Sequence, residues 1–143
     1  MIPVQLYQMP EPRQVIVDTS ALLAVLTGEP ERAALLAATE GRTLVAPASV
    51  PWEVGNALSA MLKRRRVTGT QAAMVVANYH RIPLRLIDVD LATSVEVAER
   101  LGLYAYDAYF IVCAAVHRAP LLTLDTGLAR AASKAGIRLL EVA

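Results

Sequence analysis

The chain has 143 residues, of which 55% are hydrophobic and 19% are charged. That length is typical of one domain, and this composition excludes an intrinsically disordered chain, which needs low hydrophobicity and high net charge. Fourteen basic and thirteen acidic residues leave a formal net charge of +1, so any contact with nucleic acid must come from a local patch. The single cysteine, Cys113, excludes an internal disulfide framework and a cysteine-rich zinc site.

Residues 1–13 carry three prolines and no periodic pattern, which predicts an irregular N-terminal extension ahead of a single domain over residues 14–143. The extension lacks the basic region and apolar run of a signal peptide. No stretch of the chain reaches the roughly 20 apolar residues that a membrane span requires. We therefore expect a soluble, cytoplasmic protein with no membrane partner.

Short apolar runs alternate with helical segments along the rest of the chain. In chain order, the pattern predicts a strand over 14–17, helices over 21–26 and 31–40, a strand over 43–45 stopped by Pro47, helices over 49–66 and 71–80, a strand over 84–87, helices over 91–101 and 107–117, a strand over 121–124, a helix over 128–135 and a last strand over 137–142. Ser49 is expected to cap the helix over 49–66, and the segment 68–70 is expected to separate it from the helix over 71–80. These two helices are expected to form an αα-hairpin.

This alternation predicts βαβ units, and therefore a three-layer α/β/α sandwich with a mostly parallel central sheet. Sites in such sheets lie at the carboxyl ends of the strands. The rule selects Asp18, directly after the first strand, and Asp125, directly after the fourth.

Four of the acidic residues lie in apolar or aromatic sequence surroundings: Asp18, Glu53, Asp107 and Asp125. Burying an ionised carboxylate without a counter-charge is costly, so several such acids in one chain suggest a shared cation. Mg²⁺ and Mn²⁺ prefer oxygen ligands of this kind. The three aspartates each precede an expected helix, however, so each is also explained as a helix N-cap. Glu53 lies inside a helix beside Trp52, where capping does not explain it.

Four sequence segments occur in order on the expected strands and helices: VDTSAL at 17–22, WEVGNAL at 52–58, YDAY at 106–109 and LTLDTGLA at 122–129. Together they resemble the PIN-domain nucleases, and most closely the VapC-type toxins of toxin–antitoxin pairs. The resemblance implies a PIN-like fold and a metal-dependent endoribonuclease that hydrolyses RNA phosphodiesters with metal-activated water. It also implies that Asp18, Glu53, Asp107 and Asp125 form a catalytic pocket for Mg²⁺ or Mn²⁺, with two ions during catalysis.

The same resemblance assigns supporting polar roles to Thr19, Ser20, Asn56 and Thr123. Asn56 falls three residues after Glu53, on the same face of a helix, and Thr123 falls two residues before Asp125, on the same side of a strand. The resemblance further implies a homodimer that assembles with a cognate antitoxin protein, the pair forming a type II toxin–antitoxin system.

The densest basic run is formed by Lys63, Arg64, Arg65 and Arg66, at the end of the helix that carries Glu53. This run is either a contact for the RNA backbone or a solvated helix end that suits the helix dipole. Tyr104, Tyr106 and Tyr109 surround Asp107 and fit either base stacking or ordinary packing. The two histidines, His80 and His117, are expected to have no catalytic role.

Two other functions were compared with the nuclease. An aspartyl-phosphate phosphotransferase with Asp18 as nucleophile is disfavoured, because Ser20 stands where such enzymes carry a second aspartate. The chain also lacks a glycine-rich phosphate loop, which argues against a nucleotide-hydrolysing or dinucleotide enzyme. The remaining alternative is a catalytically silent PIN-like module that binds RNA or protein.

Overall fold

Four short strands form one parallel sheet in the order β3-β2-β1-β4 in the computed structural model, which describes residues 13–142. The strands are β1 (Gln14–Val17), β2 (Thr43–Pro47), β3 (Leu84–Ile87) and β4 (Leu121–Leu122). β1 lies inside the sheet, where Ile16 pairs with Val45 of β2 and with Leu121 of β4. The strand is therefore buried on both faces, as expected for a parallel sheet between two helical layers.

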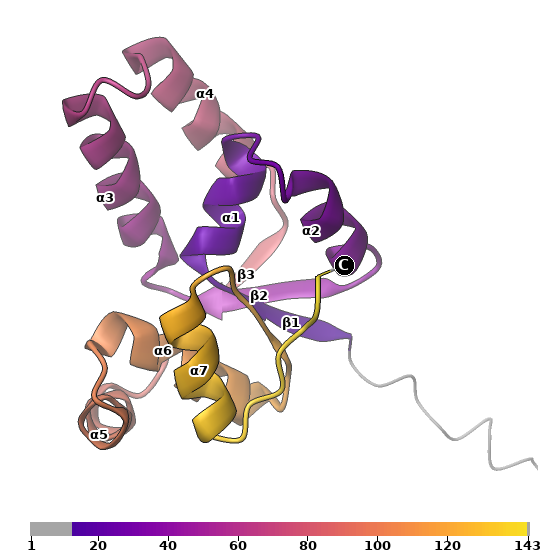
Figure 1. Cartoon of the computed structure of the whole chain (residues 1–143), viewed down its shortest axis with the longest axis vertical. Helices are drawn as coiled ribbons and strands as arrows, with labels where there is room; N and C mark the ends of the chain where they lie inside the picture. The colour runs from indigo at the N-terminus through magenta and orange to yellow at the C-terminus, as the bar shows by residue number, and fades with distance from the viewer. Residues whose placement is uncertain (1–12, 143) are drawn as a thin grey trace, which may run out of the picture.

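Helices cover both faces of this sheet (Figure 1). One layer contains α1 (Thr19–Leu26), α2 (Arg32–Thr39), α3 (Val50–Lys63) and α4 (Gly69–Tyr79). The other contains α5 (Leu91–Leu101), α6 (Ala105–His117) and α7 (Thr126–Lys134). The predicted three-layer α/β/α architecture is thus confirmed. Within the described residues, no helix is long and apolar enough to cross a membrane.

The core fills both faces of the sheet, and on one face its main helix is α6, which packs against β1, β2 and β4. Phe110, Ile111 and Cys113 of α6 are buried there, and burying a side chain such as that of Phe110 contributes roughly 1.5–3 kcal/mol. Burial also raises the pKa of the Cys113 thiol to about 12, so this cysteine behaves as a small apolar side chain.

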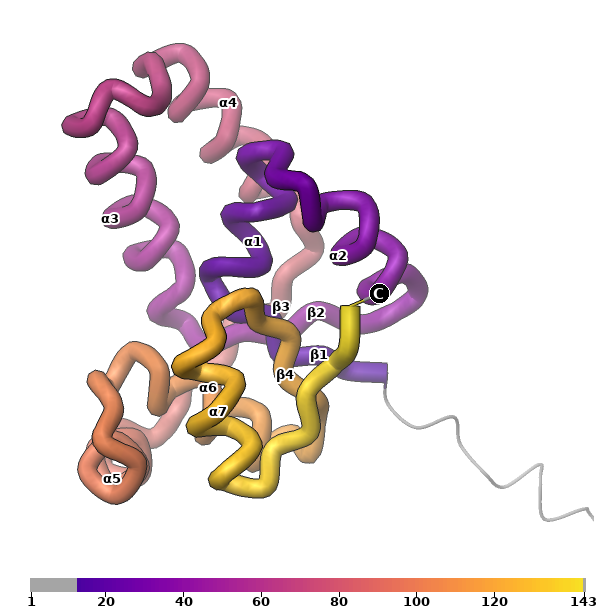
Figure 2. The backbone as a smooth tube through the Cα atoms, viewed as in Figure 1, coloured from indigo at the N-terminus to yellow at the C-terminus, as the bar shows by residue number. Residues whose placement is uncertain are grey.

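The helices α3 and α4 extend away from the sheet as the predicted αα-hairpin (Figure 2). α4 begins earlier than predicted, because Thr68 accepts a hydrogen bond from the backbone N–H of Gln71 and the Gln71 side chain accepts one from the backbone N–H of Thr68. The expected break at 68–70 is therefore the capping box of α4. α3 ends at Lys63, short of Arg66, and Arg65 then takes a left-handed conformation.

Three strand predictions differ from the structure. β2 continues to Pro47, because the next residue, Ala48, supplies an N–H to the Ile87 carbonyl and keeps the strands together. β4 ends at Leu122, because Thr123 and Leu124 turn away to bond side chains at the end of β1. The last predicted strand, over 137–142, is wrong: within the described residues it makes one isolated bridge, from Leu139 to Leu121. The predicted extension over residues 1–13 lies outside the described residues, apart from Arg13.

Candidate functional site

Asp18 is the most deeply buried acid of the described chain, with 3% of its surface exposed. It follows β1 directly and is the N-cap of α1, where its carboxylate accepts a hydrogen bond of 2.9 Å from the backbone N–H of Ala21. The Ser20 hydroxyl donates to the same carboxylate at 2.7 and 2.9 Å, and the Thr123 hydroxyl donates to it as well. The short link between β1 and α1 therefore gives Asp18 both a capping role and a fixed position at the end of the sheet.

The segment after β4 is tied to the segment after β1. The backbone N–H of Leu124 donates to the Ser20 hydroxyl at 3.0 Å, and that of Asp125 donates to the Thr123 hydroxyl at 3.0 Å. The Ser20 and Thr123 hydroxyls therefore each hydrogen-bond one group within their own segment and one group of the other segment. These contacts hold Asp125 near Asp18, as the carboxyl ends of adjacent parallel strands require.

Asp125 is exposed and is the N-cap of α7. Its carboxylate accepts hydrogen bonds from the backbone N–H groups of Gly127 at 2.8 Å and Leu128 at 3.1 Å. A Cβ atom at Gly127 would lie 3.2 Å from the Asp125 carboxylate, so glycine keeps this approach open. The capping interpretation is therefore correct for Asp18 and Asp125, and it leaves open whether the carboxylates also have a second role.

The other two acids lie in the first turns of helices. Glu53 is half-buried in α3 and accepts a hydrogen bond of 3.0 Å from the Ser49 hydroxyl. Ser49 was predicted to cap α3, but its side chain makes no capping bond and binds Glu53 instead. Asp107 is half-buried in the first turn of α6, which begins at Ala105. The capping interpretation of Asp107 is therefore wrong.

The four acids act on one another through their charges. Burial raises the pKa of Asp18, and the hydrogen bonds from Thr123, Ala21 and Ser20 lower it only in part. Burial likewise raises the pKa values of Glu53 and Asp107. The charge of Asp125 raises the pKa of Asp18 and of Asp107 further, and the charges of Asp18 and Asp107 raise that of Glu53. None of the described groups that shift these three pKa values is a base, so the acids form an unneutralised cluster.

A PIN domain model matches residues 15–134. The chain belongs to the PIN-domain family. Comparison with curated proteins gives no match.

Several solved structures share the fold of this PIN domain. A protein from Pyrobaculum aerophilum (PAE2754) superposes with a TM-score of 0.63 and 23% identity, over 88% of this chain and 85% of that one. VapC20 of Mycobacterium tuberculosis, a sarcin-ricin loop cleaving toxin, gives a TM-score of 0.59 and 17% identity, over 82% and 94% of the two chains. VapBC2 of Rickettsia felis, bound to a promoter DNA fragment, gives 0.62 and 16%, over 88% and 96%.

The acidic cluster of this PIN domain suits a hard divalent cation by its chemistry. Its side-chain donors are carboxylate oxygens, and none of the described basic groups lowers the pKa of Asp18, Glu53 or Asp107. The Thr19 hydroxyl is a further oxygen there: it is buried, it lowers the pKa of Glu53, and it has no partner with hydrogen-bond geometry in the described chain. Among residues 13–142, no three acidic, histidine or cysteine side chains already enclose one point at coordination distance. The residues therefore fit the ion by type and charge, without a preformed cage.

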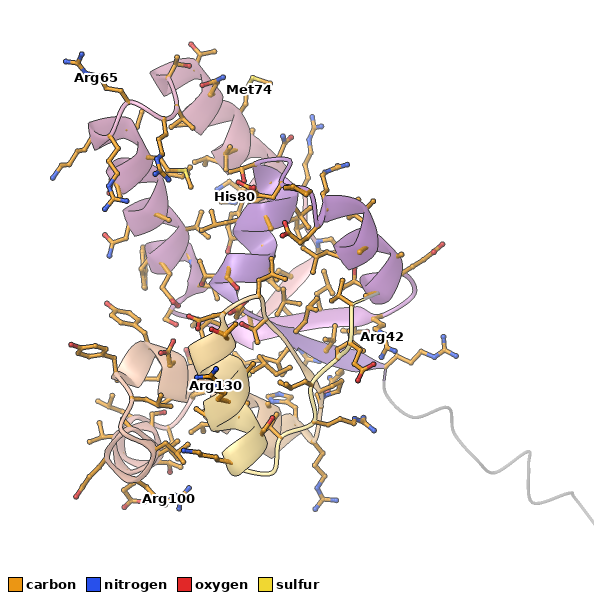
Figure 3. All side chains as sticks on the ribbon, in the orientation of Figure 1. Arg42, Arg65, Met74, His80, Arg100 and Arg130 are labelled. Atoms are coloured by element: carbon orange, nitrogen blue, oxygen red, sulfur yellow. The ribbon has the colours of Figure 1, made fainter. Side chains whose placement is uncertain are left out.

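The remaining predicted residues lie at different distances from this cluster. Asn56 is exposed on α3, one turn after Glu53, and makes no contact that defines a role. The run from Lys63 to Arg66 begins at the last residue of α3, about 15 Å along the helix from Glu53, and Figure 3 shows Arg65 at the outer end of the hairpin. The structure thus does not bring this basic run to the acids. Tyr104 and Tyr106 are exposed at the start of α6, three residues and one residue before Asp107.

Ser49 was not predicted as a partner of Glu53. The sequence feature that indicates this contact is the spacing of four residues between Ser49 and Glu53, which places both side chains on one face at the start of the helix. The two histidines lie outside the cluster: His80 is exposed, and Nδ1 of His117 lies 2.9 Å from the Cys113 carbonyl.

Proposed function

We propose that this PIN domain is a metal-dependent endoribonuclease, the toxin of a type II toxin–antitoxin system. The observation that carries the proposal is the cluster of Asp18, Glu53, Asp107 and Asp125, in which neighbouring carboxylate charges raise the pKa values of the first three and no described base lowers them. Membership of the PIN-domain family supports the nuclease class. The sarcin-ricin loop cleaving activity of VapC20 supports RNA as the substrate.

The charge of the cluster explains why a metal is needed. An RNA phosphodiester is anionic, so four carboxylates alone would repel it. Asp18, Glu53, Asp107 and Asp125 would hold Mg²⁺ or Mn²⁺, and one or two such ions would supply an activated water and stabilise the leaving oxygen. The cation would also offset the burial and the mutual repulsion that raise the pKa values of Asp18, Glu53 and Asp107.

The chain's own residues position these carboxylates. The Ser20 and Thr123 hydroxyls hold the Asp18 carboxylate from two segments, and the Ser49 hydroxyl orients Glu53. Hydrogen bonds of this kind lock ligand side chains and keep them ionised. Asp18 and Asp125 are additionally fixed by their helix N-termini, so α1 and α7 carry two of the four acids into the site.

We include an antitoxin partner and a homodimer in the proposal. The solved relatives include VapBC2 of Rickettsia felis and a toxin–antitoxin complex of Klebsiella pneumoniae, the latter with a TM-score of 0.54 and 21% identity. The hairpin of α3 and α4 exposes large apolar side chains, among them Trp52, Leu62 and Met74. Such a surface favours burial against a second chain. A cytoplasmic location belongs to the same proposal, because the RNA substrate is found there.

The decisive experiment is cleavage of total RNA by purified protein with Mg²⁺ or Mn²⁺, with EDTA and the Asp107→Asn variant alongside. Glu96→Gln, an exposed substitution on α5, is the matched control for the loss of one acidic charge. We expect discrete cuts that require metal, persist in the control and fall by at least 100-fold in Asp107→Asn, about the scale of losing one positioned electrostatic group. Cleavage that is unchanged in EDTA would contradict the proposal, and metal-independent RNA binding without any cleavage would favour the silent binding module.

A further inference from the structure

A second charged site lies at the opposite end of the sheet from the acids. A cavity of about 790 Å³ opens there, and the described residues that line it include four arginines and one histidine but no acidic residue. We call it the basic groove, and its charged lining is Arg13, Arg42, His117, Arg118 and Arg138. Four of the chain's fourteen basic residues therefore surround one cavity in a protein of net charge +1.

The sheet links the basic groove to the acidic cluster. Gln14 lines the groove and Asp18 lies four residues further along the same extended segment, which spans about 13 Å. On the neighbouring strand, Pro120 lines the groove and Thr123 donates to Asp18. The groove and the acids thus lie at the amino and carboxyl ends of β1 and β4. Figure 3 shows Arg42 near the amino ends of β1 and β2.

Local structural roles explain only part of this charge. His117 and Arg118 end α6, where a cation suits the helix dipole, and Arg42 uses its Nε to bond the Ala38 carbonyl at the end of α2. That bond occupies one of the five N–H donors of Arg42. Arg13 precedes β1 and Arg138 follows α7, and neither position is a helix end.

The backbone of Arg118 supports a role for its side chain. This residue has a φ of 50°, in the left-handed region, which residues other than glycine adopt only at a conformational cost. At the corresponding position after α5 the chain has Gly102, with a φ of 65°. Glycine is the usual residue at such a helix end, so arginine at 118 places a cation in the groove at a conformational cost.

The chemistry of the lining identifies a phosphate ligand. Arginine guanidinium groups pair with phosphate oxygens through two parallel hydrogen bonds. No Phe, Tyr or Trp is among the described residues that line the groove, so its lining favours contacts with phosphate over the stacking of several bases. We propose that the basic groove binds the phosphate backbone of substrate RNA beyond the cleaved bond. The inference rests on the proposed function and extends it, because it places a second contact for the same strand.

The inference is tested by measuring RNA binding in the absence of metal, so that no RNA is cut. The affinity of single-stranded RNA is measured by fluorescence anisotropy in EDTA, with one long RNA and one fragment too short to span both sites. The test variant is the double substitution Arg118→Gln and Arg138→Gln. The matched control is Arg32→Gln with Arg100→Gln, two exposed arginines outside the groove that remove the same charge. Thermal unfolding of all three proteins confirms that they are folded.

We expect the groove variant to bind the long RNA about tenfold more weakly, with the salt dependence of log affinity reduced by about 0.7 for each lost phosphate contact. In EDTA the acids repel RNA, so the short fragment can bind only the groove and should be weakened as well, whereas the control variant should bind both RNAs as tightly as the wild type. Equal weakening by both variants, or no weakening by either, would overturn the inference. So would binding of inorganic tripolyphosphate to the groove without groove-dependent binding of RNA, since the site would then serve a free phosphate compound.

The outcome is separable from that of the proposed function. Cleavage by the wild-type protein with metal tests the acids, whereas binding in EDTA tests the arginines. If the protein binds long RNA through the groove and cuts none, the nuclease proposal fails, and the groove remains an RNA-binding site without a place beside a cleaved bond. If the wild-type protein cuts RNA and the groove variant binds RNA as tightly as wild type, the nuclease proposal stands and the groove assignment fails.

Discussion

Asp18 combines two functions that are usually treated as alternatives. Its carboxylate caps α1 through the Ala21 N–H and lies at the centre of the acidic cluster. The position of Asp18 after the first strand was predictable, because the strand and the capping residues are adjacent in the sequence. Its bond to Thr123 was not, because the two residues are 105 positions apart and only the pairing of β1 with β4 brings them together.

Removal of the Thr123 hydroxyl provides a test at the scale of one residue. Thr123→Val deletes the donor to Asp18 and the acceptor for the Asp125 N–H. We expect the free energy of unfolding to fall by about 1–3 kcal/mol, the range for a buried polar group that loses its partner. The hydroxyl lowers the pKa of Asp18, so its loss raises that pKa, and the acid limb of the cleavage profile should move to higher pH.

Thr123→Ser is the control, because it keeps the hydroxyl and loses only a methyl group. It should restore both the unfolding free energy, measured by urea titration, and the position of the acid limb. If Thr123→Ser behaved like Thr123→Val in the pH profile, the methyl group would be responsible and the hydrogen bond to Asp18 would have no role in the chemistry.

At the scale of the elements, the helix starts organise the site. Asp18 and Asp125 precede α1 and α7, whereas Glu53 and Asp107 lie in the first turns of α3 and α6. The existence of these helices followed from apolar periodicity and turn residues. The early start of α6 did not, because no side chain caps it and Tyr104 is no usual N-cap residue. The length of β4 was overestimated because Thr123 and Leu124 leave the sheet and bond the side chains of Asp18 and Ser20.

Two substitutions at Asp125 separate capping from catalysis. Asn caps a helix about as well as Asp, so Asp125→Asn should change the unfolding free energy by only a few tenths of a kcal/mol. Asp125→Ala removes the acceptor for Gly127 and Leu128 and should cost about 1 kcal/mol. If the charge of Asp125 serves the reaction, both variants should lose cleavage, by about tenfold or more.

Measurement of the unfolding free energy and of the cleavage rate for both Asp125 variants distinguishes a helix-capping role from a role in the reaction. Suppose that Asp125→Asn cleaves as well as wild type and that Asp125→Ala loses cleavage only in proportion to its lost stability. Asp125 would then act as a helix cap alone. Gly127→Ala is a useful companion, because its added Cβ would crowd the Asp125 carboxylate without changing charge.

At the scale of the whole molecule, the topology of the fold brings together residues that are far apart in the sequence. The alternation of strands and helices predicted the fold, and the strand-end rule predicted two acids of the cluster. The basic groove had no such signal, because Arg13, Arg42, Arg118 and Arg138 are scattered along the chain and each looks like an ordinary surface residue. In the sequence, the candidate contact for the RNA backbone was the continuous run from Lys63 to Arg66. The structure places that run away from the acids.

The exposed apolar surface of the hairpin makes a prediction for assembly. Leu62 and Met74 are 41% and 61% exposed, and Figure 3 shows Met74 on the outer part of α4. We expect the chain to self-associate without an antitoxin, and Leu62→Glu with Met74→Lys to weaken that association, because burial of this apolar area is lost. Light scattering measures the mass, and Leu91→Lys, at a 64% exposed position on α5, is the control. A monomeric wild-type chain would contradict the prediction.

The acidic cluster also makes the stability of the whole domain depend on pH and metal. Burial raises the pKa values of Asp18, Glu53 and Asp107 in the folded state, so the folded protein binds protons more tightly than the unfolded one. In EDTA, the free energy of unfolding should therefore decrease as pH rises from the ordinary carboxyl range near 4 through the raised pKa values. Asp107→Asn should flatten this decrease, because it removes one of the three titrating groups.

A divalent cation should reverse the trend, because it competes with protons for the same carboxylates. At neutral pH, Mg²⁺ at about 100 times its dissociation constant should stabilise the wild-type protein by about 2.7 kcal/mol, with a smaller gain in acid. Thermal unfolding across pH, with EDTA or Mg²⁺, measures both effects, and Glu99→Gln on the exposed face of α5 is the control. Stability that rises with pH in EDTA would show that the buried acids are neutralised within the protein, and the cluster would then have no need of a metal.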